Sequence, residues 1–442
     1  MNKKNQYILL IEVLLIALFA KILSLSSKII ITRELGVEAM SLFSLVNPLI
    51  LLLLTLSSLS LQNTIGSLIA KNIRKRKIIL KNALIITIFL SGILITLLAV
   101  FSYFISNHLL NNINTFPCVI ASIFVIPLTS ISSIIKGYFI GVGELKLTSF
   151  SQIFEECGRL LFLIIILLIF PSLEAPYKAS IAVFSLCIGE IFQVMYMLLF
   201  YKNSSFKKYR EFIYINDKKD SYFHEILKSS IPLTLSRLVG SLTYFVEPIL
   251  FTSLMLKNHY PINEITISYG ILSSYVLPLV LMPGFISVTL SNLLIPNLGK
   301  MIRKKQYGKA KKFVLEIFFL CFFIGLVISL IFKFFPKEIT TIIYKNNYGE
   351  EIIRKYSLFF MIYYIETPLI TCLLFFNLSK NAFLSTCISS IIRIILIVML
   401  VGKYQIEGVL IALIVSTYVD VLMNLFFLIS FLIRQKKNSV FL

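Results

Sequence analysis

The sequence has no tryptophan, only three histidines and half as many acidic as basic residues. The histidines, His108, His224 and His259, stand far apart in polar connectors, so they form no HExxH or other metal-ligand pattern. No P-loop or GxSxG motif is present, and GVGE at 141–144 lacks the preceding strand and the third glycine of a dinucleotide-binding loop. We therefore expect neither an enzyme nor a resident metal or cofactor.

The six cysteines show no pattern typical of disulfides or metal sites. They all fall in apolar stretches, and none forms a CxxC pair or stands at ligand spacing from a histidine. They are Cys118, Cys157, Cys187, Cys321, Cys372 and Cys387. We interpret them as small core residues of helices.

Charge is scarce and one-sided in a chain that is otherwise very apolar. Of its 442 residues 58% are hydrophobic and 14% are charged, with a mean hydropathy of +0.90 and a net charge of +21. This composition excludes a soluble globular protein and indicates many membrane spans. The Lys and Arg residues lie mainly in short connectors, where retention on the cytoplasmic side explains them better than nucleic-acid binding does. We expect these basic connectors to contact anionic membrane lipids.

Twelve apolar segments are long enough to cross a bilayer, which requires about 20 residues. The predicted spans are 7–31, 40–70, 82–106, 116–136, 147–170, 179–201, 227–256, 266–297, 313–335, 353–376, 382–402 and 405–433. The first is longer than the apolar region of a cleavable signal. Several others exceed the membrane thickness, so we expect tilts or kinks, the latter near prolines such as Pro48, Pro278 and Pro283. The predicted fold class is an all-α polytopic membrane protein.

The distribution of basic residues between the spans predicts the orientation. Residues 71–81 hold six Lys or Arg and no acid, and residues 300–312 hold seven and no acid. Connectors with at most one basic residue lie near 107–115, 171–178, 257–265 and 403–407. By the positive-inside rule, the even-numbered connectors and both termini are cytoplasmic. The connector at 333–355, which is longer and mixed in charge, is predicted outside.

A basic segment occurs twice, at an offset of about 230 residues. Residues 48–77 read PLILLLLTLSSLSLQNTIGSLIAKNIRKRK, and residues 278–305 read PLVLMPGFISVTLSNLLIPNLGKMIRKK. In each, an asparagine (Asn63, Asn292) follows the first proline by 14 or 15 residues and precedes the basic cluster. Two similar halves are typical of a transporter whose site lies between them. The predicted six-helix lobes are 1–201 and 227–442, joined by a cytoplasmic basic linker at 202–226.

Ionisable residues at membrane depth are costly and usually paired or facing water. In the first span Lys21 and Lys28 share one helical face, and Arg33 follows at the outer end. In the seventh span Arg237 and Glu247 lie along one broad face. Because these residues have no local partner in the sequence, we expect them to line a water-filled cavity.

A second group of charges is open to a structural role. Glu155 and Arg159 stand at i and i+4, the spacing of an intrahelical ion pair. Arg159 and Arg393 each follow a loop lysine (Lys146, Lys380) by 13 residues, a helical rise of about 20 Å that places both deep in the membrane. They either lock helices together or line the cavity.

The excess of cations in the candidate lining favours an anionic ligand. Arginine binds phosphate bidentately and lysine binds it as a point charge. A drug-exporting antiporter would instead need carboxylates for cations and protons, for which Glu155, Glu247 and Asp420 are the candidates. The net positive charge of the candidate cavity lining therefore favours a phosphate-bearing substrate.

From residue 136 the chain reads KGYFIGVGELKLTSFSQIFEECGRL. This resembles the junction of spans 4 and 5 in the stage V sporulation protein B group of polysaccharide and lipid-linked oligosaccharide exporters. The matching residues are Lys136, Gly137, Tyr138, Phe139, Gly141, Ser151, Gln152, Glu155 and Arg159. Span 1 with Arg33 and Gly36, and span 8 with Pro278, Pro283 and Pro296, are similar to the same group. The chain departs from it in having fewer spans and in the turn NLSKNAF before span 11.

The resemblance implies the multidrug/oligosaccharidyl-lipid/polysaccharide exporter fold, which is MATE-like, with two pseudo-symmetric six-helix lobes around a central cavity. It also implies flipping of undecaprenyl-diphosphate-linked oligosaccharides, or of a peptidoglycan precursor, for cell-wall, polysaccharide or spore-cortex synthesis. We expect a lipid-linked sugar diphosphate as partner, a monomer, and the cytoplasmic membrane of a Gram-positive bacterium. Coupling would come from Na⁺, H⁺ or the membrane potential.

The leading hypothesis is a flippase that works by alternating access. The candidate head-group contacts are Lys21, Lys28, Arg33, Arg159, Arg237 and Arg393, and the candidates for coupling or charge pairing are Glu155, Glu247 and Asp420. Two alternatives stay open. One is a cation-coupled multidrug exporter of the same fold, and the other is a non-transporting membrane scaffold for a wall-synthesis complex.

Overall fold

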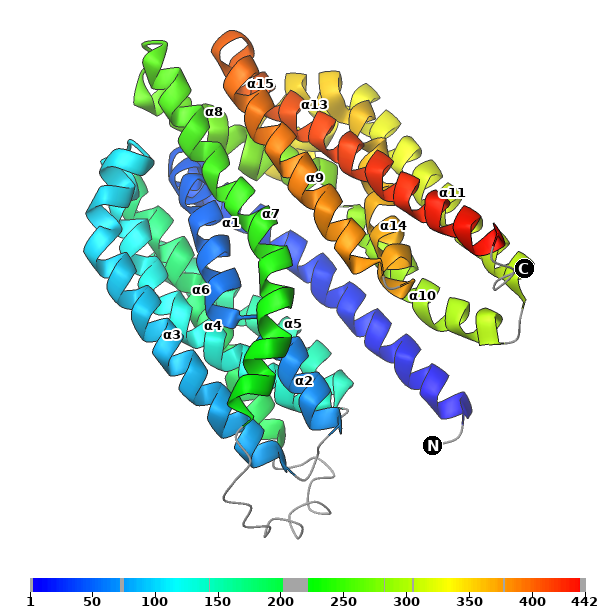
Figure 1. Ribbon diagram of the computed structural model, residues 1–442. Helices are drawn as coiled ribbons and strands as arrows, with labels where there is room; N and C mark the ends of the chain where they lie inside the picture. The colour runs from blue at the N-terminus through cyan, green and yellow to red at the C-terminus, as the bar shows by residue number, and fades with distance from the viewer. Residues whose placement is uncertain are drawn as a thin grey trace. The chain divides into compact units, whose positions relative to one another are not determined.

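The computed structural model describes residues 3–71, 75–142, 144–201, 222–281, 283–303, 306–376 and 378–437. Within these ranges every regular element is a helix and none is a strand, which confirms the predicted all-α class (Figure 1). The chain divides into two compact units, Met1–Phe245 and Val246–Leu442. The division falls inside one helix, α7 (Phe223–Lys257).

The first unit is a bundle of long apolar helices, coloured blue to green in Figure 1. It contains α1 (Lys3–Ser58), α2 (Leu61–Lys71), α3 (Arg76–Phe104), α4 (Phe116–Val142), α5 (Leu145–Ile169), α6 (Ala175–Tyr201) and the first part of α7. The short turns η2 (Ile105–Leu109) and η3 (Ile113–Thr115) lead from α3 to α4. Helix α4 packs against α2, α3 and α6, and α5 packs against α1 and α6.

Helix α1 is two helices that meet at Gly36. This residue has φ 75° and ψ 171°, whereas its neighbours are helical. A positive φ is the region that glycine adopts without a Cβ penalty. The break separates the predicted first span, 7–31, from the start of the second, 40–70.

The second predicted span is itself interrupted, between α1 and α2. Leu59 and Ser60 have φ of 42° and 51°, although neither is a glycine. The interruption frees the carbonyl of Ser57, and the buried Ser130 of α4 donates its Oγ–H to that oxygen at 3.2 Å. An unpaired buried carbonyl costs about 1–3 kcal/mol, so this bond from a neighbouring helix stabilises the interruption at membrane depth.

The second unit begins within α7 and continues to the end of the described chain. Its further elements are α8 (Ile262–Gly270), the π-helix η5 (Ile271–Val276), α9 (Leu277–Leu281), α10 (Gly284–Arg303), α11 (Tyr307–Phe334), α12 (Pro336–Tyr344), α13 (Glu350–Tyr356), the 3-10 helix η6 (Ser357–Ile362), α14 (Tyr363–Phe375) and α15 (Ser379–Lys437). Its apolar core lies between α10, α11, α14 and α15, where Leu294, Cys372 and Leu373 are fully buried.

Both copies of the repeated segment contain an interrupted helix. In the first copy the helix breaks at Leu59 and Ser60, and in the second α9 ends at Leu281 and α10 begins at Gly284. Pro283 stands in the second interruption, as the predicted kink requires, whereas no proline stands in the first. Interrupted helices in corresponding spans of two halves are a feature of transporters.

The predicted outer connector at 333–355 contains regular structure that the sequence analysis did not expect. Helix α12 fills much of it, with Thr340 and Tyr344 buried and Ile342 exposed. Helix α15 then combines the predicted spans 382–402 and 405–433, which a non-helical residue, Gln405 with φ 51°, divides.

The described residues carry the surface of a membrane protein. Nine helical stretches are long and apolar enough to cross a bilayer, and two of them, Ile22–Ile69 and Lys380–Ile433, contain the kinks described above. On α3 the side chains of Ile88, Phe89 and Val100 are 69–75% exposed. A soluble protein buries such surface, so the chain is a multi-pass membrane protein. The count of twelve spans and the cytoplasmic placement of the termini stay predictions.

The predicted linker, 202–226, lies largely outside the described residues. Tyr222 and Ile226, at its end, are buried against α2 and α3 in the core of the first unit. The predicted lobe bounds, 1–201 and 227–442, stay predictions.

Candidate functional site

Charged side chains from three helices of the first unit meet around Lys136. Its Nζ on α4 lies 3.8 Å from Glu155 Oε2 on α5 and 3.7 Å from Glu190 Oε2 on α6. Both distances exceed that of a hydrogen bond. Glu190 Oε2 is buried and has no hydrogen-bond partner among the described residues. We call Lys136, Glu155 and Glu190 the triad.

Arg159 has a different partner from the predicted one. Its Nη2 donates to Glu156 Oε2, three residues earlier on α5, while Glu155 faces Lys136. The prediction of a Glu155–Arg159 pair is therefore wrong. Spacings of three and four residues both place side chains on one helical face, and the sequence contains an acid at each. Glu155 faces Lys136 on α4, which leaves Glu156 as the partner of Arg159.

Close approach of α5 and α6 holds this region together. A Cβ at Gly158 would lie 2.5 Å from Cγ of Phe192, and a Cβ at Gly189 would lie 3.0 Å from the backbone oxygen of Glu155. Both positions therefore favour glycine. The triad consequently lies in a tightly packed region. We call the packed region between α4, α5 and α6 around the triad the seam.

A second polar pair crosses the seam between α4 and α6. The Ser132 Oγ–H donates to Gln193 Oε1 at 3.1 Å, and both side chains are fully buried. Gln193 Nε2 and the Arg159 Nε are buried without a hydrogen-bond partner in the described part of the chain. The seam therefore has unused hydrogen-bonding capacity beside its charges.

The second unit contains a tighter charge pair. Arg393 of α15 donates its Nη2 to Glu247 Oε2 of α7, and the side chains are 15% and 2% exposed. The Tyr269 hydroxyl of α8 donates to Glu247 Oε1 at 3.4 Å. Both carboxylate oxygens of Glu247 thus have a donor. The sequence analysis placed Glu247 without a local partner, and the structure supplies one that lies 146 residues away.

Asp420, the third predicted carboxylate, lies in a polar network of hydroxyl and amide side chains. Its Oδ2 accepts a hydrogen bond from Asn424 Nδ2 at 2.9 Å, and its Oδ1 accepts one from Ser389 Oγ at 3.5 Å. The Ser385 hydroxyl in turn donates to Asn424 Oδ1 at 2.6 Å. All four side chains are buried on α15, on either side of its kink.

The other predicted head-group contacts lie on α1 and α7. Lys28 and Arg33 are half-buried on α1, and each makes an interaction within the structure. The Lys21 side chain lies outside the described residues. Arg237 is exposed on α7, and the ion pairs among the described residues do not include it. Arg159 and Arg393 are instead held by carboxylates.

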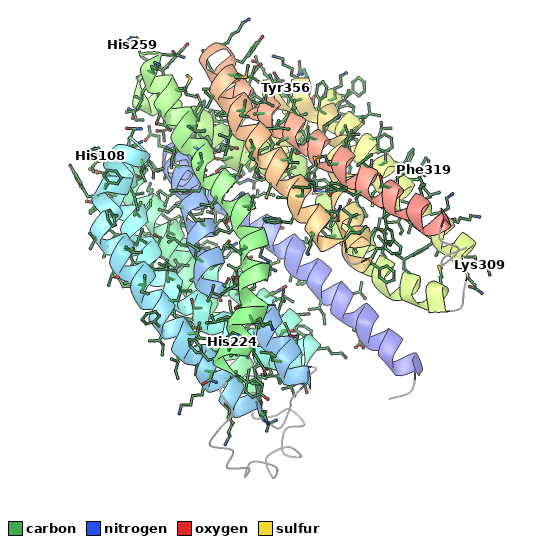
Figure 2. All side chains as sticks on the ribbon, viewed as in Figure 1. His108, His224, His259, Lys309, Phe319 and Tyr356 are labelled. Atoms are coloured by element: carbon green, nitrogen blue, oxygen red, sulfur yellow. The ribbon has the colours of Figure 1, made fainter. Side chains whose placement is uncertain are left out.

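The histidines stand at helix ends, as Figure 2 shows. His108 lies in η2, His224 in the first turn of α7, and His259 in the turn after α7. No group of three or more His, Cys, Asp or Glu with metal-binding geometry occurs in the searched, described residues. The free cysteines are buried or half-buried there.

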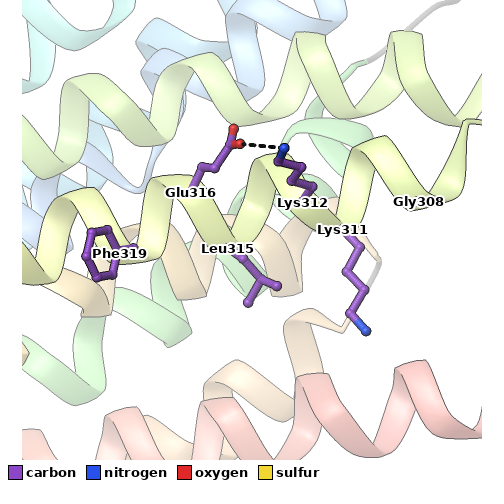
Figure 3. A pocket seen from close by; sticks show the side chains of 6 residues that line it. All are labelled: Gly308, Lys311, Lys312, Leu315, Glu316 and Phe319. Atoms are coloured by element: carbon purple, nitrogen blue, oxygen red, sulfur yellow. Dashed lines mark ion pairs between the residues drawn. The ribbon is translucent and has the colours of Figure 1, made fainter.

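An open pocket of about 400 Å³ lies on α11 of the second unit (Figure 3). Its lining comes from a single helix and consists of Gly308, Lys311, Lys312, Leu315, Glu316 and Phe319. Lys312 and Glu316 form an exposed ion pair at 4.0 Å, drawn as the dashed line in Figure 3. This pocket brings together none of the predicted site residues.

Sequence reasoning missed three members of the charged seam. Lys136 stands in the sequence analysis only within the resembling motif, and neither Glu190 nor Glu156 is among the predicted site residues. The signal for Glu156 was its spacing of three residues from Arg159. For Lys136 and Glu190 the signal is weaker, because they lie on different helices and no periodicity links them.

Sequence comparisons place these features in a family. Residues 10–302, more than half of the chain, match the family described as polysaccharide biosynthesis protein. Stage V sporulation protein B of Bacillus subtilis (strain 168) is 26% identical over 389 residues, which cover 87% of this chain and 75% of that protein. Sporulation protein YkvU of the same strain is 23% identical over 449 residues, covering 100% of this chain and 98% of that protein.

Solved structures share the fold. The lipid II flippase MurJ in an inward closed conformation has a TM-score of 0.69 at 16% identity, covering 93% of this chain and 86% of that one. An inward-facing multidrug resistance transporter of the MATE family and MOP superfamily has a TM-score of 0.64 at 12% identity, covering 96% and 99%. The predicted MATE-like fold is confirmed, and the chain belongs to the polysaccharide biosynthesis protein family.

Proposed function

We propose that this chain is a flippase that moves an undecaprenyl-diphosphate-linked oligosaccharide, or a peptidoglycan precursor, across the cytoplasmic membrane. The observation that carries the proposal is the family match over residues 10–302 in a chain with a transporter fold. Polysaccharide synthesis needs a route across the membrane for sugars attached to a lipid carrier. The likeness in fold to a lipid II flippase supports a substrate of this class.

The diphosphate head group requires cations that are accessible at membrane depth. Arg237 meets this requirement best, since it is exposed on α7. Lys28 and Arg33 of α1 are half-buried and add positive charge. The sequence spacing of seven residues between Lys21 and Lys28 makes Lys21 a further candidate. In the proposed cycle these residues bind the diphosphate while the lipid tail stays in the bilayer.

Arg159 and Arg393 have a subordinate place in this proposal. Each is already bonded to a carboxylate, Glu156 and Glu247 respectively. To bind a phosphate either arginine would have to exchange its partner, which leaves a buried carboxylate uncompensated. We assign Arg393 to charge pairing that positions α15 against α7, and Arg159 to an ion pair within α5.

Complementation tests the proposal directly. The chain is expressed in a bacterial host depleted of its lipid-linked precursor flippase, and growth and precursor on each leaflet are scored. Rescue is expected, and Arg237→Ala is expected to lower the flipping rate roughly tenfold or more, because a charge-assisted contact is worth about 1.5–3 kcal/mol. Absence of rescue despite confirmed membrane insertion contradicts the assigned substrate.

Arg354→Ala is the matched control for Arg237→Ala. Arg354 is also an arginine of a membrane-crossing stretch, but it is 59% exposed and paired with Glu350 at 2.7 Å on α13. Its loss is expected to leave flipping unchanged. Equal loss in both variants would indicate a general effect on folding rather than a head-group contact.

A cation-coupled multidrug exporter is the second candidate, favoured by the likeness in fold to MATE transporters. For this function the buried acids of the second unit, Glu247 and Asp420, are the coupling candidates. Resistance of a sensitive host to cationic drugs, lost in Asp420→Asn, would support it. Flipping of the lipid-linked precursor without any drug resistance would exclude it.

A further inference from the structure

The triad carries one negative charge more than it can balance. Lys136 contributes one positive charge, whereas Glu155 and Glu190 contribute two negative ones. Arg159 does not correct the difference, because Glu156 neutralises it. An uncompensated charge in a buried seam is costly, so a form in which one positive charge is added is favoured.

Other charged and titratable groups lie near the triad. The charges that act on Glu155 are those of Glu190, Lys136, Glu156 and Arg159, and Glu190 in turn acts on the Cys187 thiol. Helix α1, which packs against α4, α5 and α6, carries Lys28 and Arg33, each with an interaction of its own.

The positive charge that fits is a proton rather than a metal ion or a larger cation. The Lys136 ammonium already occupies the position between the two carboxylates, 3.7–3.8 Å from each. A metal ion there would be repelled by it, and it would need several oxygens at about 2.0–2.6 Å. The close approach of α5 and α6 at Gly158 and Gly189 leaves little room for a larger group. A proton needs only one free carboxylate oxygen, and Glu190 Oε2 is one.

We infer that the triad of Lys136, Glu155 and Glu190 is a proton-binding site of the first unit. A proton from water adds to one of the two carboxylates of the triad and forms a neutral carboxylic acid. Lys136 then pairs with the other carboxylate alone, and the net charge of the triad changes from −1 to 0. Loss of the proton restores the bridging lysine. Use of this site to drive transport rests on the proposed function, whereas proton binding itself does not.

Infrared difference spectroscopy tests the site on the purified full-length protein in lipid nanodiscs. The pH is lowered from about 8 to about 5.5, a range above the ordinary pKa of exposed carboxyls, and the carbonyl band of protonated carboxylic acids is recorded. When the pH-difference spectrum of Glu190→Gln is subtracted from that of the wild type, the remaining carbonyl band is expected to correspond to about one carboxylic acid. Glu316→Gln, on the exposed face of α11, is the matched control and is expected to retain the full wild-type band.

Lys136→Gln provides a second test that leaves both carboxylates of the triad in place. Without the ammonium, the two carboxylates face each other, so the band is expected already at about pH 8. A titration with NaCl against choline chloride at fixed pH is expected to change nothing. The inference is overturned if Glu190→Gln retains the full band, if Lys136→Gln leaves the titration unaltered, or if Na⁺ shifts the carboxylate bands in wild type only.

The same preparations separate this inference from the proposed function. If the triad band is present but the protein flips no lipid-linked precursor, the proton-binding site is supported and the proposed flippase function is contradicted. If the protein flips the precursor but the triad band is absent, the flippase function is supported and the proton-binding site is contradicted.

Discussion

Two buried charge groups, one in each unit, are held in opposite ways. In the second unit Arg393 and Glu247 balance each other, and both oxygens of Glu247 receive a hydrogen bond. In the first unit one lysine is shared between Glu155 and Glu190 at distances too long for hydrogen bonds. The Arg393–Glu247 pair has one favourable arrangement, whereas the triad of Lys136, Glu155 and Glu190 has at least two.

The difference teaches what a charge at membrane depth can do. A balanced, fully bonded pair fixes the positions of the helices that carry it, because any separation exposes two uncompensated charges. An unbalanced group with an unused oxygen can exchange partners or take up a proton at small cost. Buried charge is therefore evidence for a fixed contact in the Arg393–Glu247 pair and for a responsive one in the triad.

Removing one member of the balanced pair is expected to have the largest effect. Arg393→Ala leaves Glu247, 2% exposed, as an unpaired buried carboxylate. The free energy of unfolding in detergent micelles is expected to fall by about 3–5 kcal/mol. The double variant Arg393→Met with Glu247→Leu is expected to recover most of this loss. A double variant as unstable as the single one would contradict the pairing.

Packing at the seam comes next. Gly158→Ala places a Cβ 2.5 Å from the Phe192 ring, so α5 and α6 must separate, and we expect a loss of about 1–3 kcal/mol in the free energy of unfolding. Gly92→Ala on α3 is the control, since nothing lies within 4 Å of its Cβ. It is expected to be neutral or slightly stabilising. Equal effects of the two substitutions would argue against a tight seam.

The unbalanced group should tolerate loss of one acid. Glu190→Gln removes the excess charge and leaves Lys136 with Glu155, so the free energy of unfolding is expected to change by about 1 kcal/mol or less. Glu247→Gln, measured in parallel, is expected to cost more because Arg393 then loses its only charged partner among the described residues. The reverse order would break the comparison between the units.

The exposed ion pair on α11 is expected to contribute least to the free energy of unfolding. Lys312 and Glu316 have side chains that are 80% and 55% exposed and stand 4.0 Å apart. Lys312→Ala is expected to change the free energy of unfolding by less than about 0.5 kcal/mol, since the water screens this pair. A change above that of Glu190→Gln would show that exposure is a poor guide to these contributions.

Much of the fold was predictable because a bilayer imposes long apolar segments on the sequence. The break at Gly36 falls between two predicted spans, and the break at Gln405 falls at the first residue of another. The position of the interruption at Leu59 and Ser60 could not be predicted from local sequence, because it depends on a hydrogen bond from Ser130 of another helix. Helix α12 was missed because nine residues are too few for a periodic pattern to stand out.

The charged residues show where sequence reasoning ends. Depth and residue type identified Glu155, Arg159, Glu247 and Arg393 as unusual. Their partners follow from packing between helices, which places residues 146 positions apart in contact in the Arg393 pair. Local spacing therefore predicted the wrong acid for Arg159 and no partner for Glu247. The roles assigned to Lys28, Arg33 and Arg237 stay predictions.

The most direct measurement is leaflet-resolved transport by the purified protein in proteoliposomes loaded with an undecaprenyl-diphosphate-linked sugar. The account predicts that the wild-type chain moves the lipid-linked sugar between leaflets, that Arg237→Ala slows this movement, and that Arg354→Ala does not. A chain that leaves the lipid-linked sugar in its original leaflet while exporting a cationic dye would contradict the account and establish the multidrug exporter instead.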